Sequence, residues 1–199
     1  MKLRVIVLVS VLLSVSFFGF KNLNSVAGRK WLVLPGSHLQ VTGFTNINQF
    51  KCEIENYSIP DTLYVASKAP KVQLKGDLCI GVQSFNCHNP LITRDMVSTL
   101  KGKVFPYMTI RFLSLNSNPN FQECSDIKGE VEIILAGVSK NFDISYNFDK
   151  DGQSNVLMSG VKTISFADFN LQPPIKMGGA IKTKQTLIVE FTLKLKPLP

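Results

Sequence analysis

The stretch that decides the fold is GEVEIILAGVSKNFDISYNFD, residues 129–149. In its second half, four large apolar side chains alternate without a break with polar or charged ones. These four are Phe142, Ile144, Tyr146 and Phe148. A period of two places them on one face of a strand and the polar residues on the other. With AGVSK as a turn, the stretch predicts an antiparallel hairpin of strands 129–136 and 141–149.

The same alternation recurs along most of the chain after residue 28. Strands are expected where apolar residues alternate or cluster between turn-forming segments such as NSNPN and DKDGQ. Besides the hairpin, the expected strands lie at or near 39–41, 50–57, 72–82, 107–115, 156–166 and 187–195. This makes eight strands, with GGAIKTKQ as a short turn into the last one.

One segment departs from the period of two. In TRDMVSTLKG, Thr93 is suited to cap a helix N-terminus, Gly102 is suited to end the helix, and three apolar residues share one face. We expect a short helix at about 93–101. Eight strands with a single helix predict an all-β fold, either a closed antiparallel barrel or a sandwich. A barrel of about eight strands either fills its interior with side chains or holds one small ligand.

The first 27 residues predict an export signal. MKLR is basic, VIVLVSVLLSVSFF is apolar, and SVAG ends in small residues suited to cleavage before Gly28. The apolar run is shorter than the about 20 residues that span a bilayer. We therefore expect residues 1–27 to be a cleaved signal peptide and residues 28–199 to be a single domain. The expected location is periplasmic or secreted, without stable membrane insertion after cleavage.

The charge of the chain argues against nucleic acid as a partner. Removal of residues 1–27 takes away Lys2, Arg4 and Lys21 and no acid, so the formal net charge falls from +8 to +5. The remaining lysines are spread singly, without a basic block or a nucleic-acid-binding motif. Whether two chains form a homodimer stays open.

Four cysteines, Cys52, Cys79, Cys87 and Cys124, lie in the expected mature chain. Exported proteins meet oxidising conditions, so disulfides are the default state. Spacings of 27, 8 and 37 residues lack the close C-x-x-C pairs of structural zinc sites. We therefore expect two disulfides, or one disulfide and two buried thiols, and no metal. Three pairings stay open.

Catalytic signatures are scarce, although catalysis needs a converging set of titratable groups. The two histidines, His38 and His88, do not form an H-x-x-x-H pair. A triad of His88, Asp95 and a serine is the rival interpretation, but a histidine in a surface loop is the simpler one. The sequence contains no nucleophile-elbow or nucleotide-binding motif. We expect a protein that is not an enzyme and has no cofactor.

Several short motifs follow one another over about residues 35–196. They are a strand ending near Ser84, an Arg94-Asp95 helix start, a strand from Tyr107 to Phe112 after Pro106, a hairpin from Gly129 to Lys140, and Asp168-Phe169 before the last strand. Their order and spacing resemble the YceI-like family, in its cysteine-containing form from exported bacterial proteins.

This resemblance implies a lipocalin-like, eight-stranded antiparallel barrel whose apolar lumen binds a polyisoprenoid or another long amphiphilic lipid. Carriage or storage of an isoprenoid or fatty-acyl lipid would follow, without catalysis. The residues expected at the lumen or its mouth are Val82, Ser84, Met96, Leu100, Ile110, Phe112, Ile144, Tyr146, Phe169 and Met177. The alternative is a secreted structural or interaction module with a filled core and no ligand.

The antiparallel layout implied by the resemblance also suggests cysteine pairs. Cys52 begins one strand and Cys87 ends the next, so these two are expected to pair, which leaves Cys79 near Cys124.

The segment DFNLQPPIKMGG contains two adjacent prolines that cannot donate to a ladder. It is expected to leave the sheet and either cap the cavity or form an ordinary surface loop. The residues expected in such a cap are Phe169, Leu171, Ile175 and Met177.

Overall fold

The computed structural model describes residues 28–199 except 58, 69–70, 120, 122–126 and 199. The expected signal peptide lies outside these residues. The strands are β1 Arg29–Val33, β2 Ser37–Thr45, β3 Gln49–Tyr57, β4 Thr62–Lys68, β5 Lys71–Gly81, β6 Tyr107–Leu115, β7 Ile127–Leu135, β8 Val138–Lys150, β9 Val156–Ser165, β10 Ile175–Lys176 and β11 Ile181–Leu198. The helix is α2 Pro90–Thr99, and the 3-10 turns are η2 Val82–Ser84, η3 Phe166–Phe169 and η4 Met177–Gly179.

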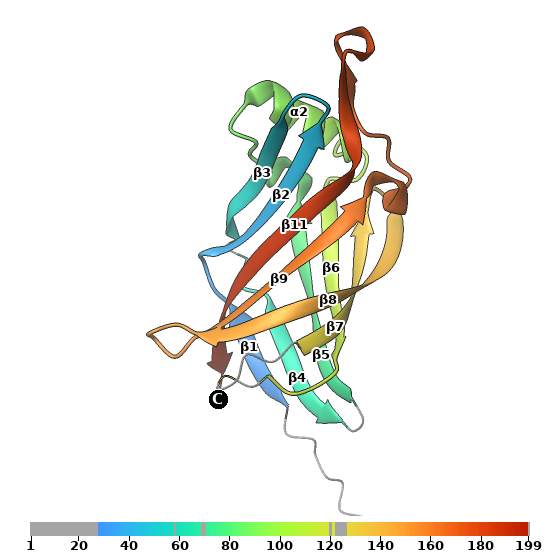
Figure 1. Cartoon of the computed structure of the whole chain (residues 1–199). Coiled ribbons are helices and arrows are strands. Elements are labelled where there is room, and N and C mark those ends of the chain that lie inside the picture. Colours follow the sequence, from blue (N-terminus) through green and yellow to red (C-terminus); the bar gives the residue numbers. More distant parts are fainter. Residues whose placement is uncertain (1–27, 58, 69–70, 120, 122–126, 199) are drawn as a thin grey trace, which may run out of the picture.

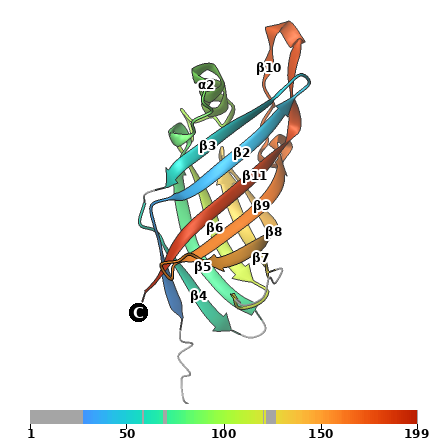
Figure 2. The ribbon, with the colours of Figure 1, turned by 60° about the vertical axis from the view of Figure 1, so that its left-hand side comes forward.

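Eight of these strands form a closed barrel, in the order β1-β4-β5-β6-β7-β8-β9-β11 and back to β1. The barrel closes through β1, which pairs antiparallel with β4 on one side and with β11 on the other. Figures 1 and 2 show the barrel, with α2 and the β10–β11 hairpin at the same end. We call this the apical end. The predicted eight-stranded antiparallel barrel with one short helix is confirmed, and the sandwich alternative is wrong.

The strands β2 and β3 extend the barrel wall toward the apical end. β11 pairs first with β2 and further along with β1, so β1 and β2 follow one another beside a single strand. β3 pairs with β2, and one isolated bridge joins Glu53 of β3 to Asn86 after β5. A disulfide between Cys52 and Cys87 joins the same two segments, with 3.9 Å between the Cα atoms. The expected Cys52–Cys87 pair is confirmed.

The second expected cysteine pair stays a prediction. Cys79 is exposed on β5 and has no disulfide partner among the residues that the structure describes. Cys124 lies outside those residues.

The hairpin that decided the fold is confirmed. β7 and β8 pair from Leu135–Val138 at the turn to Ile127–Tyr146 at the far end. The two turn residues, Ala136 and Gly137, both have positive φ values, 51° and 81°. This is the backbone that a two-residue hairpin turn requires, and glycine adopts it at no steric cost.

The helix begins three residues earlier than predicted. Asn89 is the N-cap, and its side chain accepts hydrogen bonds from the backbone N–H groups of Leu91 and Ile92. Pro90 occupies the first turn, where its missing N–H costs nothing. Thr93, the predicted cap, lies inside the helix, and its hydroxyl accepts from the Cys87 N–H at 3.0 Å. The Asn-Pro pair is therefore the true start signal.

The last strand also begins earlier than predicted. GGAIKTKQ was expected to be a turn, but β11 starts at Ile181 and projects beyond the barrel together with β10. In the segment expected as a cap, Phe169 and Leu171 are buried, whereas Ile175 and Met177 are 63% and 77% exposed. Capping by Ile175 and Met177 is therefore wrong, because both side chains lie on the projecting hairpin, away from the core.

Candidate functional site

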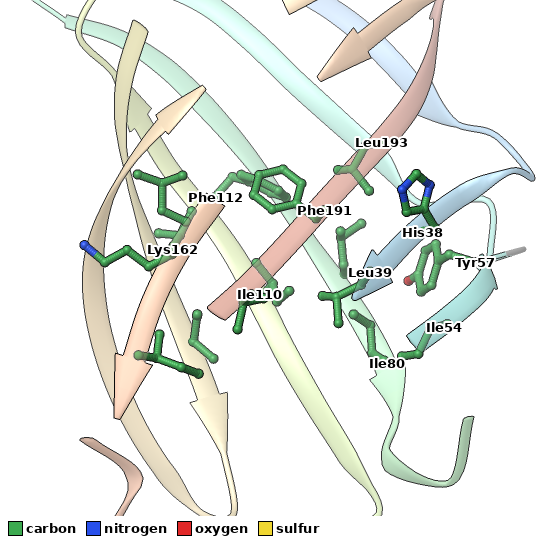
Figure 3. A pocket seen from close by; sticks show the side chains of 16 residues that line it. His38, Leu39, Ile54, Tyr57, Ile80, Ile110, Phe112, Lys162, Phe191 and Leu193 are labelled. Atoms are coloured by element: carbon green, nitrogen blue, oxygen red, sulfur yellow. The ribbon is translucent and has the colours of Figure 1, made fainter. Parts of the chain in front are cut away.

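The barrel encloses a cavity of about 50 Å³ (Figure 3). Its wall is mainly leucine, isoleucine, valine and phenylalanine, contributed by β2, β3, β5, β6, β7, β8, β9 and β11. The lining residues are His38, Leu39, Ile54, Tyr57, Leu78, Ile80, Ile110, Phe112, Val131, Ile133, Ile144, Lys162, Ile164, Val189, Phe191 and Leu193. Pockets that hold drug-sized ligands measure about 300–1,000 Å³, so in this conformation side chains fill most of the barrel.

Aromatic rings occupy much of the remaining interior. Tyr146 is 1% exposed, and its ring centroid lies 6.5 Å from that of Phe112 and 6.0 Å from that of Phe191. Phe148 continues the row toward Trp31, with centroid distances of 6.1 Å on each side. Because Phe112 and Phe191 also line the cavity, their rotamers determine how far the cavity extends toward this row.

The hydroxyl of Tyr146 is buried without a hydrogen-bond partner among the described residues. Burial raises the pKa of Tyr146 well above its usual value, so the side chain stays neutral. An unpaired buried hydroxyl is costly, and native structures usually supply water or a ligand to such a group. Tyr146 therefore offers a polar contact among the aromatic side chains that surround it.

Tyr57 contrasts with Tyr146 because its hydroxyl is fully engaged. It donates to the Asp61 carboxylate, and the Cys79 carbonyl oxygen lies 3.3 Å away as a second acceptor. Burial, and then the hydrogen bond to Asp61, raise the pKa of Tyr57 above its usual range. This side chain holds the β3–β4 connection against β5 and leaves no free donor for a ligand.

The ladder between β8 and β9 covers only part of the two strands. Their ladder runs from Lys150–Val156 to Ser145–Val161 and ends there, although both strands continue. Lys162, on the inward face of β9, reaches across, and its Nζ donates to the Asp143 carbonyl oxygen at 2.8 Å. Figure 3 shows this side chain extending away from the apolar cluster. A side chain and not a backbone ladder thus closes this part of the wall.

A second, apolar hollow of about 300 Å³ lies at the apical end. It is bounded by the β2–β3 turn, by α2 and by the β10–β11 hairpin. Its apolar residues are Ile47, Phe50, Ile92, Met96, Phe166 and Ile181. Met96 and Phe166 also belong to the buried core, so they lie between this hollow and the barrel interior.

The expected site residues fall into three groups. Ile110, Phe112 and Ile144 line the cavity. Val82, Met96, Leu100, Tyr146 and Phe169 are buried in the core around it. Ser84 and Met177 are exposed and lie outside the cavity. Contact of any of these residues with a ligand stays a prediction.

Most residues that line the cavity were not predicted from the sequence. Leu78, Ile80, Val189 and Leu193 belong to the alternating patterns, so the inward face of every strand was the available signal. Lys162 gave no such signal, because a charged residue on an inward face breaks the alternation.

The titratable groups do not form the triad that the sequence suggested as a rival. His88 bonds through Nε2 to the Glu53 carboxylate, while Asp95 pairs with Lys176 at 2.7 Å. Ligand atoms of Glu53, Glu55 and His88 lie within 4.8 Å of one another, a set of donors that suits a divalent cation. The three side chains are partly or fully exposed.

Comparison with known proteins shows the fold. No family model and no curated protein matches the sequence. BcnA of Burkholderia cenocepacia superimposes with a TM-score of 0.61 at 13% identity, over 79% of this chain and 95% of BcnA. A polyisoprenoid-binding domain from Saccharophagus degradans, implicated in plant cell wall breakdown, gives a TM-score of 0.58 at 15% identity, over 84% of this chain and 97% of that domain. The Campylobacter jejuni YCEI protein gives 0.48 at 18% identity, over 67% and 80%.

The fold and the site define a closed antiparallel barrel with a narrow apolar interior. The fold expected from the YceI-like resemblance is confirmed, and the chain shares it over nearly the full length of BcnA and of the Saccharophagus degradans domain. Within the described part of the chain, no helix has the length and apolarity needed to cross a membrane.

Proposed function

We propose that this protein is an exported, non-catalytic carrier that encloses the hydrocarbon tail of an isoprenoid or fatty-acyl lipid in its barrel. The observation that carries the proposal is the cavity inside the closed barrel, with a wall built mainly of aliphatic and phenylalanine side chains. Each methylene buried there gains about 0.8 kcal/mol. The polyisoprenoid-binding domain of Saccharophagus degradans has the same fold, which supports this choice of ligand class.

Export is supported by the disulfide. Cys52 and Cys87 are 0% and 6% exposed and are joined to each other. Stable disulfides belong to oxidising compartments. This agrees with the basic and apolar residues at the start of the chain.

Binding requires the cavity to widen, because about 50 Å³ is too small for a lipid tail. Two features of the wall make widening inexpensive. Rotation of the Phe112 and Phe191 rings joins the cavity to the space around Tyr146 without breaking a hydrogen bond. Separation of β8 from β9 beyond Ser145 breaks the Lys162 contact and the Lys140–Asp168 ion pair but no ladder hydrogen bond. We infer that a tail enters through these movements.

The small cavity also favours the second candidate function, a secreted interaction module whose barrel core is filled. In that case, the aromatic row is ordinary core packing and no lipid is carried.

The two candidates separate in one experiment. The protein is purified from its native host without detergent, extracted with organic solvent, and the extract is analysed by mass spectrometry. Recovery of a stoichiometric isoprenoid or fatty-acyl lipid supports the carrier. No recovered lipid, together with no uptake of added polyprenol or fatty acid, supports the filled module.

Matched variants test whether the barrel interior holds the ligand. Ile110→Arg places a charge in the cavity wall and should abolish lipid uptake, whereas Thr109→Arg, on the outer face of the same strand, should not. Ile110→Phe keeps the wall apolar and narrows the cavity, so it should fold and take up less lipid. Normal folding and full uptake by both Ile110 variants would contradict binding in the barrel.

A further inference from the structure

Large apolar side chains are exposed at the apical end of the barrel. Ile175 and Met177 are 63% and 77% exposed on the β10–β11 hairpin, and Ile47 is 70% exposed at the β2–β3 turn. Leu91, at the start of α2, is 61% exposed. Figures 1 and 2 show these three segments projecting from the same end of the molecule. Exposed apolar side chains gathered at one end indicate a contact site more than scattered ones do.

Specific contacts hold the three segments together. Asn46 at the β2–β3 turn donates its backbone N–H to the Lys182 carbonyl oxygen at 3.1 Å and its Nδ2 to the Ala180 carbonyl oxygen at 2.9 Å. Its Oδ1 accepts from the Lys182 N–H at 2.9 Å. Lys176 of the hairpin pairs with Asp95 of α2 at 2.7 Å. These contacts therefore hold the exposed apolar side chains of the three segments in a fixed arrangement.

The same segments carry an excess of positive charge. Residues 44–49, 89–107 and 171–186 contain six basic residues, and Asp95 is their single acidic residue. The basic residues are Arg94, Lys101, Lys103, Lys176, Lys182 and Lys184. Asp95 is already paired with Lys176, and the other five basic residues are exposed. The complementary surface is therefore anionic.

We propose that the apical end is a docking surface for an anionic lipid bilayer. Ile175 and Met177 enter the boundary between headgroups and acyl chains, and the surrounding lysines contact lipid phosphates. A bilayer is the partner that fits because the apolar side chains lie at the tips of separate turns, not on one flat face. A fluid surface accommodates such tips, whereas a rigid protein partner needs a complementary groove. This inference goes beyond the proposed function and does not depend on a ligand in the barrel.

Vesicle co-sedimentation tests the proposal. The probes are vesicles of phosphatidylcholine alone and of phosphatidylcholine mixed with phosphatidylglycerol. The protein should bind the anionic vesicles, and binding should weaken with added salt because exposed charges are screened. The Ile175→Ser/Met177→Ser variant should bind at least about tenfold more weakly, since each serine removes several apolar carbons from the inserted tip.

Val161→Ser is the matched control, because Val161 is 55% exposed but lies on β9 in the barrel wall. It should bind as the unchanged protein does. Failure to bind anionic vesicles, or equal binding by the hairpin variant, would overturn the proposal. So would concentration-dependent self-association in analytical ultracentrifugation that the hairpin variant abolishes, because the apical end would then be an interface with a second copy. Vesicle co-sedimentation does not measure lipid uptake into the barrel, so its result is independent of the carrier function.

Discussion

Replacing Tyr146 with phenylalanine removes a single oxygen atom from the barrel interior. In the unliganded protein that oxygen is buried and has no hydrogen-bond partner among the described residues, while Phe112 and Phe191 pack beside its ring. A buried polar group without a partner costs about 1–3 kcal/mol. Tyr146→Phe should therefore raise the free energy of unfolding by about 1–3 kcal/mol. For a domain of this size, the melting temperature should rise by about 2–12 °C.

Thermal and urea unfolding of lipid-free protein measure this change. Tyr57→Phe is the matched control, because it removes the same atom from a tyrosine whose hydroxyl bonds to Asp61 and to the Cys79 carbonyl. This variant should lose about 1–3 kcal/mol, so the two substitutions should shift stability in opposite directions. A fall in melting temperature for Tyr146→Phe would refute the reasoning, since it would show that the Tyr146 hydroxyl has a stabilising partner.

Three further outcomes are expected. Removing the disulfide with Cys52→Ala/Cys87→Ala frees a loop with a sequence separation of 35, which should cost about 3.8 kcal/mol and lower the melting temperature by about 8–15 °C. A change below about 2 °C would contradict this estimate. In the folded protein the pKa values of Tyr57 and Tyr146 lie above 10.0, so both residues lose their protons more easily in the unfolded chain. Their contribution to the free energy of unfolding should be complete below about pH 10. It should fall as the pH rises further, by up to about 1.4 kcal/mol per pH unit for each residue. Urea unfolding should show a flatter alkaline profile for either Phe variant. Hydrogen bonds from the Asn155 side chain, and then from the backbone of the β8–β9 turn, lower the pKa of Asp151 below its usual 3.8. The contribution of Asp151 to the free energy of unfolding should therefore be present above about pH 4 and be lost as the pH falls. The melting temperatures of the unchanged protein and of Asp151→Ala should therefore converge in acid, and a constant difference would contradict this assignment.

Period-two alternation predicted an all-β fold and six of the eight barrel strands, because one face of each of these strands is buried, but it missed β1 and β4 and did not decide between a barrel and a sandwich. It failed where the chain leaves the barrel. Lys182 and Lys184 lie on a strand, yet the projecting part of β11 is solvated on both sides, so no alternation marks it. The early helix start depended on Asn89 and Pro90, a local signal that outweighs the Thr93 cap.

The candidate site was predicted only in part. Ile110, Phe112 and Ile144 were assigned to the lumen from the family resemblance, and the structure places them in the cavity wall. Met177 was assigned to the lumen from the same resemblance and was also expected in a cap, but its side chain is 77% exposed on the projecting hairpin. The size of the cavity depends on how the aromatic rings fit together across the barrel, and no pattern along the chain encodes this.

The long strand β11 has a mechanical consequence. Between Thr186 and Leu195 it pairs without interruption with β9, and this part carries Val189, Phe191 and Leu193 of the cavity wall. Its pairing with β2 is irregular between Thr183 and Leu187, where the strand passes the rim of the barrel. We therefore expect a load applied to the hairpin tip to bend the strand at this irregular step, while the Asn46 contacts and the Lys176–Asp95 pair keep the β2–β3 turn and α2 together with the hairpin. The continuous ladder with β9 should then keep its register around the cavity.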